Sequence, residues 1–154
     1  MMKTLKITNP INKTVLILSI FIAISSLQCN REKLLYQSWI LEQYGPEGTL
    51  VNVTFPSSGD TPVKKEIKLN LAENGKFSGN DGCNSLMGNF TSEKGRKIQF
   101  SHITSTLMMC RPEVMSQSRA MMSILKIVSK YKVTDTSLLL LTDNKEMLKY
   151  RKAQ

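Results

Sequence analysis

The chain has few of the side chains on which enzyme chemistry depends: among its 154 residues, one is histidine and three are cysteine. No motif would hold the single histidine, His102, against a cysteine thiolate, so a Cys–His catalytic pair is not indicated. His102 alternates with Ile103 and is expected on the exposed face of a strand end. Asp81 is the one carboxylate in the glycine-rich segment 78–84, which therefore holds no acid–base pair of the glycosidase type. The sequence predicts no catalytic residues and no cofactor.

A run of basic residues interleaved with aromatic ones, as nucleic-acid-binding modules have, is also missing. Aromatic residues make up 6% of the chain, and the net charge of +9 comes from scattered lysines and arginines. We therefore expect no nucleic-acid partner. The positive charge either keeps the protein soluble or attracts it to anionic lipid headgroups or acidic polysaccharide.

No acidic residue occurs before Glu32. The apolar run 15–24 is short compared with the roughly 20 residues that a membrane-spanning helix needs. Three lysines precede this run: Lys3, Lys6 and Lys13. Basic residues followed by a short apolar run are typical of a secretory signal peptide, which we predict over residues 1–28.

Cys29 follows this region at the position where bacterial lipoproteins are cleaved and acylated. The usual recognition box has leucine three residues before the cysteine and a small residue directly before it. Here Leu27 lies two residues before the cysteine, and Gln28 intervenes. We predict lipidation of Cys29. The alternatives are ordinary secretion with cleavage near Ser25 or Ser26, or an uncleaved anchor.

Lipidation of Cys29 would leave one small mature domain with a net charge of +6. We divide the chain into the signal peptide, a lipidated tether over residues 29–35 and a folded domain over residues 36–154. The expected location is the bacterial cell envelope, with the lipid anchor in the outer membrane and either face possible. We expect a monomer whose partners are the membrane and an envelope protein or anionic ligand.

The two other cysteines stand in unlike segments. Cys83 lies among glycine, asparagine and aspartate, which favour tight turns, and Cys110 ends the apolar run 106–110. In an oxidising compartment we predict a Cys83–Cys110 disulfide, which would stabilise the fold by roughly 3 to 4 kcal/mol. The alternatives are buried, reduced cysteines, or reactive or metal-binding thiols.

A copper site is the sharpest of these alternatives, because thioether and thiolate ligands favour Cu(I). Met108 and Met109 would point to opposite faces of a strand, so only one of them could easily join Cys110. A disulfide would also remove the thiolate, and we predict no metal site. The soft donors close in sequence are His102, Met108, Met109, Cys110 and Met115.

Beyond Cys29 the pattern is mainly that of strands. They are predicted over residues 36–44, 50–55, 66–71, 88–91, 97–100, 137–142 and 146–151, with a loop over 56–62. Strict alternation in the third strand directs Ile67, Leu69 and Leu71 toward the core. The Asn-Gly pair within 73–76 predicts a hairpin turn.

One helix of about five turns is predicted to begin at Pro112, with Glu113 at the positive end of its dipole. Its inward stripe consists of Val114, Ser118, Met121, Leu125 and Val128. Its polar face is expected to show Gln117, Arg119 and Lys126 to solvent.

In this order of signals the chain resembles the META domain family, whose bacterial members include the heat-shock lipoprotein HslJ. The residues that carry the resemblance are Trp39, Gly75, Phe77, Gly79, Gly82, Cys83, Asn84, Gly88, Asn89, Phe90, Ile103, Thr106, Met108 and Cys110. The resemblance implies a mainly β (α+β) fold, a compact antiparallel barrel-like sheet with one packed helix in the C-terminal half. It also implies an envelope or stress-related role and offers no catalytic residues. The expected function is non-enzymatic scaffolding or binding; the alternative is a surface-exposed adhesin-like or polyanion-binding module.

Overall fold

The computed structural model describes residues 33–54, 66–93 and 95–154. The chain divides into two compact units, and the described elements belong to the second, Leu34–Gln154. The predicted signal peptide, Cys29 and the loop 56–62 lie wholly or mostly outside the described residues.

The described part of the chain consists of strands and one helix between the sixth and seventh strands. The strands are β1 (Ser38–Pro46), β2 (Val51–Asn52), β3 (Lys68–Leu71), β4 (Lys76–Asn80), β5 (Ser85–Glu93), β6 (Lys97–Ser105), β7 (Val128–Val133), β8 (Ser137–Thr142) and β9 (Glu146–Lys152). The helix is α2 (Pro112–Lys126).

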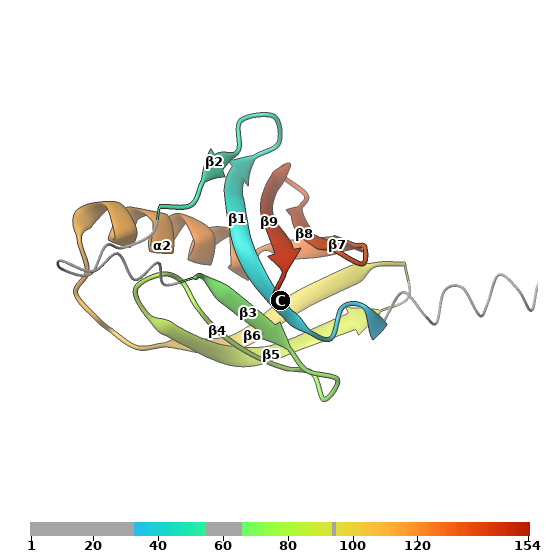
Figure 1. Ribbon diagram of the computed structural model, residues 1–154. Coiled ribbons are helices and arrows are strands. Elements are labelled where there is room, and N and C mark those ends of the chain that lie inside the picture. The colour runs from blue at the N-terminus through green and yellow to red at the C-terminus, as the bar shows by residue number, and fades with distance from the viewer. Residues whose placement is uncertain (1–32, 55–65, 94) are drawn as a thin grey trace, which may run out of the picture. The chain divides into compact units, whose positions relative to one another are not determined.

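The sheet closes on itself. Its order is β2-β1-β3-β4-β5-β6-β7-β8-β9, and β9 also pairs with β1, so that every strand except β2 belongs to one antiparallel barrel (Figure 1). The short β2 pairs with β1 outside this ring, at Gln43 and Tyr44. The predicted fold class, a mainly β barrel-like sheet with one helix in the C-terminal half, is confirmed.

Strand alternation fills the barrel interior. Ile67, Leu69 and Leu71 are buried as predicted, and the chain turns after them with the Gly75 N–H donating to the Ala72 carbonyl at 3.1 Å. Gly75 has a φ of 75°, which glycine adopts without steric cost. Large side chains from all around the ring meet in one core: Trp39, Leu41, Phe77, Leu86, Phe90, Ile98, Phe100, Tyr131, Leu138, Leu140, Leu148 and Tyr150.

The core also includes Leu35, a residue predicted to lie in the lipidated tether, residues 29–35. Its side chain is fully buried, and its carbonyl accepts a hydrogen bond from Trp39 Nε1 at 3.0 Å. The packed domain therefore includes this residue.

The helix packs against β1, β6 and β9. Met121 and Leu125 are buried as predicted, but α2 spans 15 residues, about four turns, and ends at Lys126. The prediction that Val128 belongs to the helical stripe was wrong, because the chain enters β7 at this residue.

Gln117 was predicted on the exposed helix face, and this was wrong: its side chain is 2% exposed. Its Nε2 donates to the Thr54 carbonyl at 3.0 Å, and its Oε1 accepts from the Thr54 N–H at 2.7 Å. The amide side chain of Gln117 satisfies the N–H and the carbonyl of Thr54 at once, so its burial costs little free energy. Of the strand predicted over residues 50–55, the described residues form only β2, and Thr54 pairs with Gln117 of the helix.

Candidate functional site

The two cysteine-bearing segments meet at one end of the barrel. Cys83 and Cys110 form a disulfide across 27 residues, with their Cα atoms 5.9 Å apart. It joins the turn between β4 and β5 to the loop that leads from β6 into α2. The segment 106–110 belongs to no strand, so the expectation that Met108 and Met109 point to opposite faces of a strand was wrong.

Asp81 organises the turn between β4 and β5. Its side chain is 1% exposed, and Oδ1 accepts hydrogen bonds from the N–H groups of Cys83 at 2.9 Å and Asn84 at 2.5 Å. Oδ2 accepts from the Ser118 hydroxyl of α2 at 2.6 Å. A buried carboxylate is costly unless donors surround it, and this one binds the turn to the helix through both oxygens.

Asn84 holds the loop beyond β6. Its side-chain Oδ1 accepts from the Met108 N–H at 2.7 Å and from the Thr106 hydroxyl at 3.2 Å. Thr106 Oγ1 in turn accepts from the Ser85 N–H at 3.1 Å. The loop is therefore fixed at its start by Asn84 and at its end by the disulfide of Cys110.

Two glycines of the site have steric reasons to be there. A Cβ on Gly79 would lie 2.1 Å from the Lys68 carbonyl oxygen, so any side chain would push β3 away from β4. Gly82 has a φ of 91°, in the region that favours glycine, and a Cβ there would lie 3.2 Å from the Ile67 side chain. Gly79 therefore allows β4 to lie close to β3, and Gly82 allows the turn to pack against Ile67 and against Gln117 of α2.

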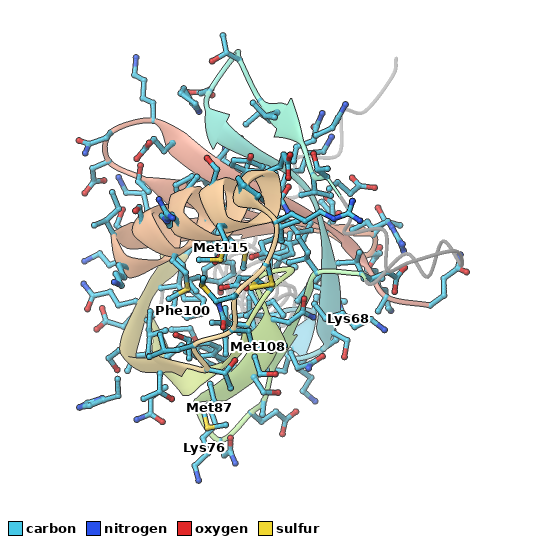
Figure 2. All side chains as sticks on the ribbon, turned by 90° about the vertical axis from the view of Figure 1, so that its left-hand side faces the viewer. Lys68, Lys76, Met87, Phe100, Met108 and Met115 are labelled. Carbon is cyan, nitrogen blue, oxygen red and sulfur yellow. A yellow bond between two sulfur atoms is a disulfide. The ribbon has the colours of Figure 1, made fainter. Side chains whose placement is uncertain are left out.

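The loop between these fixed points presents apolar side chains to solvent. Leu107 is 97% exposed, Met108 56% and Met109 96%. Met87, on the outer face of β5, is 61% exposed (Figure 2). We call residues 106–109 the apolar loop. Apolar side chains this exposed in a loop that is so firmly held are a typical mark of an interaction surface.

The apolar loop lies at the far end of the barrel from the start of the described chain. The Thr106 N–H donates to the Ser85 carbonyl at the first residue of β5, whereas the Tyr36 hydroxyl contacts Ser92 Oγ at 3.2 Å near its last. Seven residue steps along β5 separate these contacts by roughly 23 Å. Figure 1 shows this separation, with the start of the described chain, ahead of β1, on the right and the chain entering α2 on the left.

The soft side chains that could bind copper do not form a site with a free thiolate. Met115 Sδ lies 3.7 Å from Cys83 Sγ, but both cysteine sulfurs belong to the disulfide and neither is a thiolate. His102 is exposed on β6 with a φ of 50°. Within the described residues no group of three or more histidine, cysteine, aspartate or glutamate side chains could hold a metal ion.

The residues singled out in the sequence lie near this end of the barrel or on the strands that lead to it. Gly82, Cys83 and Asn84 lie in the turn, Thr106 and Met108 in the apolar loop, Cys110 directly after it, and Gly79 and Gly88 on β4 and β5. Cys29 lies outside the described residues. The sequence did not predict the hydrogen bonds of Gln117 with Thr54 and of Ser118 with Asp81, because these residues are 63 and 37 positions apart in the chain.

A closed antiparallel barrel, a helix across it and a disulfide between a glycine-rich turn and the chain before that helix define a small β-barrel domain. The META domain model matches residues 32–154, and the chain belongs to the META domain family. None of the curated proteins compared with the chain matches it.

Solved structures share this fold. A protein from Burkholderia xenovorans, determined by NMR, is 24% identical with a TM-score of 0.64, covering 82% of this chain and 88% of that one. A DUF4847 family protein from Bacteroides vulgatus is 15% identical with a TM-score of 0.57, covering 80% of this chain and 99% of that one. These similarities show the fold alone. No helix among the described residues is long and apolar enough to cross a membrane.

Proposed function

We propose that the protein is a non-enzymatic lipoprotein of the bacterial envelope, anchored in the outer membrane through Cys29, which binds a partner protein through the apolar loop. The sequence supports the anchor, because basic residues and a short apolar run precede Cys29. The family resemblance favours a role in envelope stress.

The observation that carries the binding role is the apolar loop itself. Leu107 and Met109 are almost fully exposed, yet the loop is fixed by Asn84 and the disulfide. A surface that is ordered before binding loses less conformational entropy when a partner covers it. A protein with an apolar pocket is therefore the partner that this loop fits.

The position of the loop favours a partner away from the anchoring membrane. The chain enters the barrel beside Tyr36, and the loop lies at the other end of β5. A tether that ends near Tyr36 would hold that end toward the lipid and direct the apolar loop away from it.

Intact-mass measurement of protein extracted from native membranes tests the anchor. We expect an acylated chain that begins at Cys29, and loss of the acyl mass in Cys29→Ser. An unacylated chain in the membrane fraction would contradict the anchor.

Site-specific photocrosslinking in intact cells tests the binding surface. A photoreactive residue at Met109 should crosslink to a defined partner, and one at Glu73, an exposed turn residue at the opposite end, should not. Adding Leu107→Ser should lower the yield at position 109 about tenfold, since burial of a leucine contributes about 1.5 to 3 kcal/mol. Equal yields at positions 73 and 109, or no effect of Leu107→Ser, would reject the loop as the binding surface.

A further inference from the structure

The apolar loop holds two thioethers at the surface. Met109 is 96% exposed and Met108 56%, whereas Met121 is fully buried and Met147 is 8% exposed. Access of an oxidant to sulfur depends on this exposure, so the methionines of one chain differ widely in their susceptibility.

We propose that Met108 and Met109 are a reversible oxidation site that converts the apolar loop from an apolar to a polar surface. The co-reactant is a two-electron oxidant of the peroxide class. The thioether sulfur attacks one peroxide oxygen, an S–O bond forms and the O–O bond breaks. The sulfur loses two electrons, and the second oxygen leaves as hydroxide, which takes the proton from the oxygen now bound to sulfur and becomes water. The product is methionine sulfoxide, a polar and chiral side chain.

The fold tolerates this change because the fixed points of the loop involve no thioether of Met108 or Met109. Met108 is held through its backbone N–H by Asn84, and the chain after Met109 is held by the Cys110 disulfide. A sulfoxide on either side chain would project into water and leave the barrel core unchanged. Oxidation of Met108 and Met109 would therefore change the polarity of the surface and leave the stability of the fold unchanged.

Reduction restores the thioether. Methionine sulfoxide reductases, one for each sulfoxide epimer, take the oxygen away as water at the expense of two electrons from their thiols. Exposure that admits peroxide at Met109 also admits these enzymes. The consequence for partner binding rests on the proposed function, whereas the modification itself rests only on the exposure of the two side chains.

Peptide mapping after graded treatment with hydrogen peroxide tests the modification. The full chain in detergent is first alkylated, so that no free thiol consumes the oxidant. We expect Met109 to form sulfoxide first and about tenfold faster than Met121, with Met87 and Met108 next. The near-ultraviolet circular dichroism spectrum should not change, and reductase treatment should remove the sulfoxides of the loop. Equal rates at Met109 and Met121, or loss of the spectrum when only the loop is oxidised, would overturn the proposal.

A matched variant tests whether oxidation of Met108 and Met109 is what lowers partner binding. Met108→Leu together with Met109→Leu keeps the loop apolar but leaves no thioether there. Met87, with an exposure of 61%, serves as an oxidisable methionine outside the loop. Peroxide should lower photocrosslinking from position 107, where an apolar photoreactive residue keeps the apolar character of Leu107, about tenfold when Met108 and Met109 are present and leave it unchanged in the double leucine variant. An equal loss in both would assign the effect to Met87 or another residue and reject the switch. If no partner crosslinks at all, the proposed function fails while the mapping still decides the modification.

Discussion

Asp81 shows how much one buried residue can determine at this end of the barrel. It is the only charged side chain in the buried set of the described residues, and it is surrounded by two backbone N–H groups and one hydroxyl. The neighbouring Asn84 uses its side-chain oxygen in the same way, toward the apolar loop. Two adjacent acceptors thus connect a turn, a helix and a loop.

Asp81→Ala should lower the free energy of unfolding by about 2 to 4 kcal/mol, because it leaves buried N–H donors without an acceptor. Asp81→Asn keeps one acceptor oxygen and should cost less. Ser118→Ala removes a single hydrogen bond and should cost about 1 kcal/mol. Urea unfolding of the three variants gives the comparison, and an Asp81→Ala midpoint equal to that of the parent would refute the role assigned to this carboxylate.

Glu66 gives a pH dependence at the barrel surface. Its modest burial raises the pKa of its carboxyl, but hydrogen bonds and charges from Lys68 and Arg151 outweigh this and lower the pKa below its ordinary value. A carboxyl whose pKa is lower in the folded state stabilises the fold above its unfolded pKa, and this contribution is lost as the pH falls through the folded pKa.

The stability difference between the parent and Glu66→Gln should therefore be present at pH 7 and shrink below about pH 4.5. Thermal unfolding at a series of pH values measures it. A difference that stays constant from pH 7 to pH 3 would show that the ion pairs of Glu66 with Lys68 and Arg151 do not matter to stability.

Among the elements, the apolar loop depends most on contacts from outside itself. It lies between β6 and α2 and belongs to no strand, and its order comes from Ser85, from Asn84 and from the disulfide. The disulfide restricts the end of the loop, and Asn84 restricts its beginning.

Asn84→Ala should free the beginning of the loop while the disulfide stays intact. We expect faster hydrogen exchange at the Met108 amide, by about tenfold for the loss of a hydrogen bond worth about 1 to 1.5 kcal/mol. Amides in the middle of β8, such as that of Leu140, serve as the internal control. Unchanged exchange at Met108 would mean that the disulfide alone orders the loop.

For the whole molecule, the decisive feature is closure of the barrel by β1 and β9. Their pairing runs from Trp39 with Lys152 to Pro46 with Glu146, with one irregularity near Leu41, and it leaves neither strand with a free edge. The disulfide adds a second long-range constraint to this closed ring.

Cys83→Ser with Cys110→Ser should lower the free energy of unfolding by about 3 to 4 kcal/mol and Tm by about 10 °C, because the unfolded chain loses its cross-link. The barrel should still form, since neither Cys83 nor Cys110 belongs to the hydrophobic core cluster. Calorimetry of the variant and of the reduced parent should agree. A Tm equal to that of the oxidised parent would show that the disulfide serves only to hold the apolar loop.

Local pattern was enough to determine much of this protein. Alternation of apolar and polar residues places Ile67, Leu69 and Leu71 in the core, because side chains along a strand point to opposite faces. The Asn-Gly pair at Gly75 determines a turn through the backbone freedom of glycine. Each of these features depends only on residues close together in the chain, and so each can be predicted from the sequence.

Tertiary structure decided the rest, because the chemistry of one segment does not reveal its distant partners. Gln117 has the polarity of a surface residue, yet it is buried because Thr54, 63 residues away, offers both a donor and an acceptor. Met109 has the polarity of a core residue, yet it is exposed because the contacts of Asn84 and Cys110 hold the loop away from the core. Burial follows from which segments meet in space, and only the closed barrel determines that.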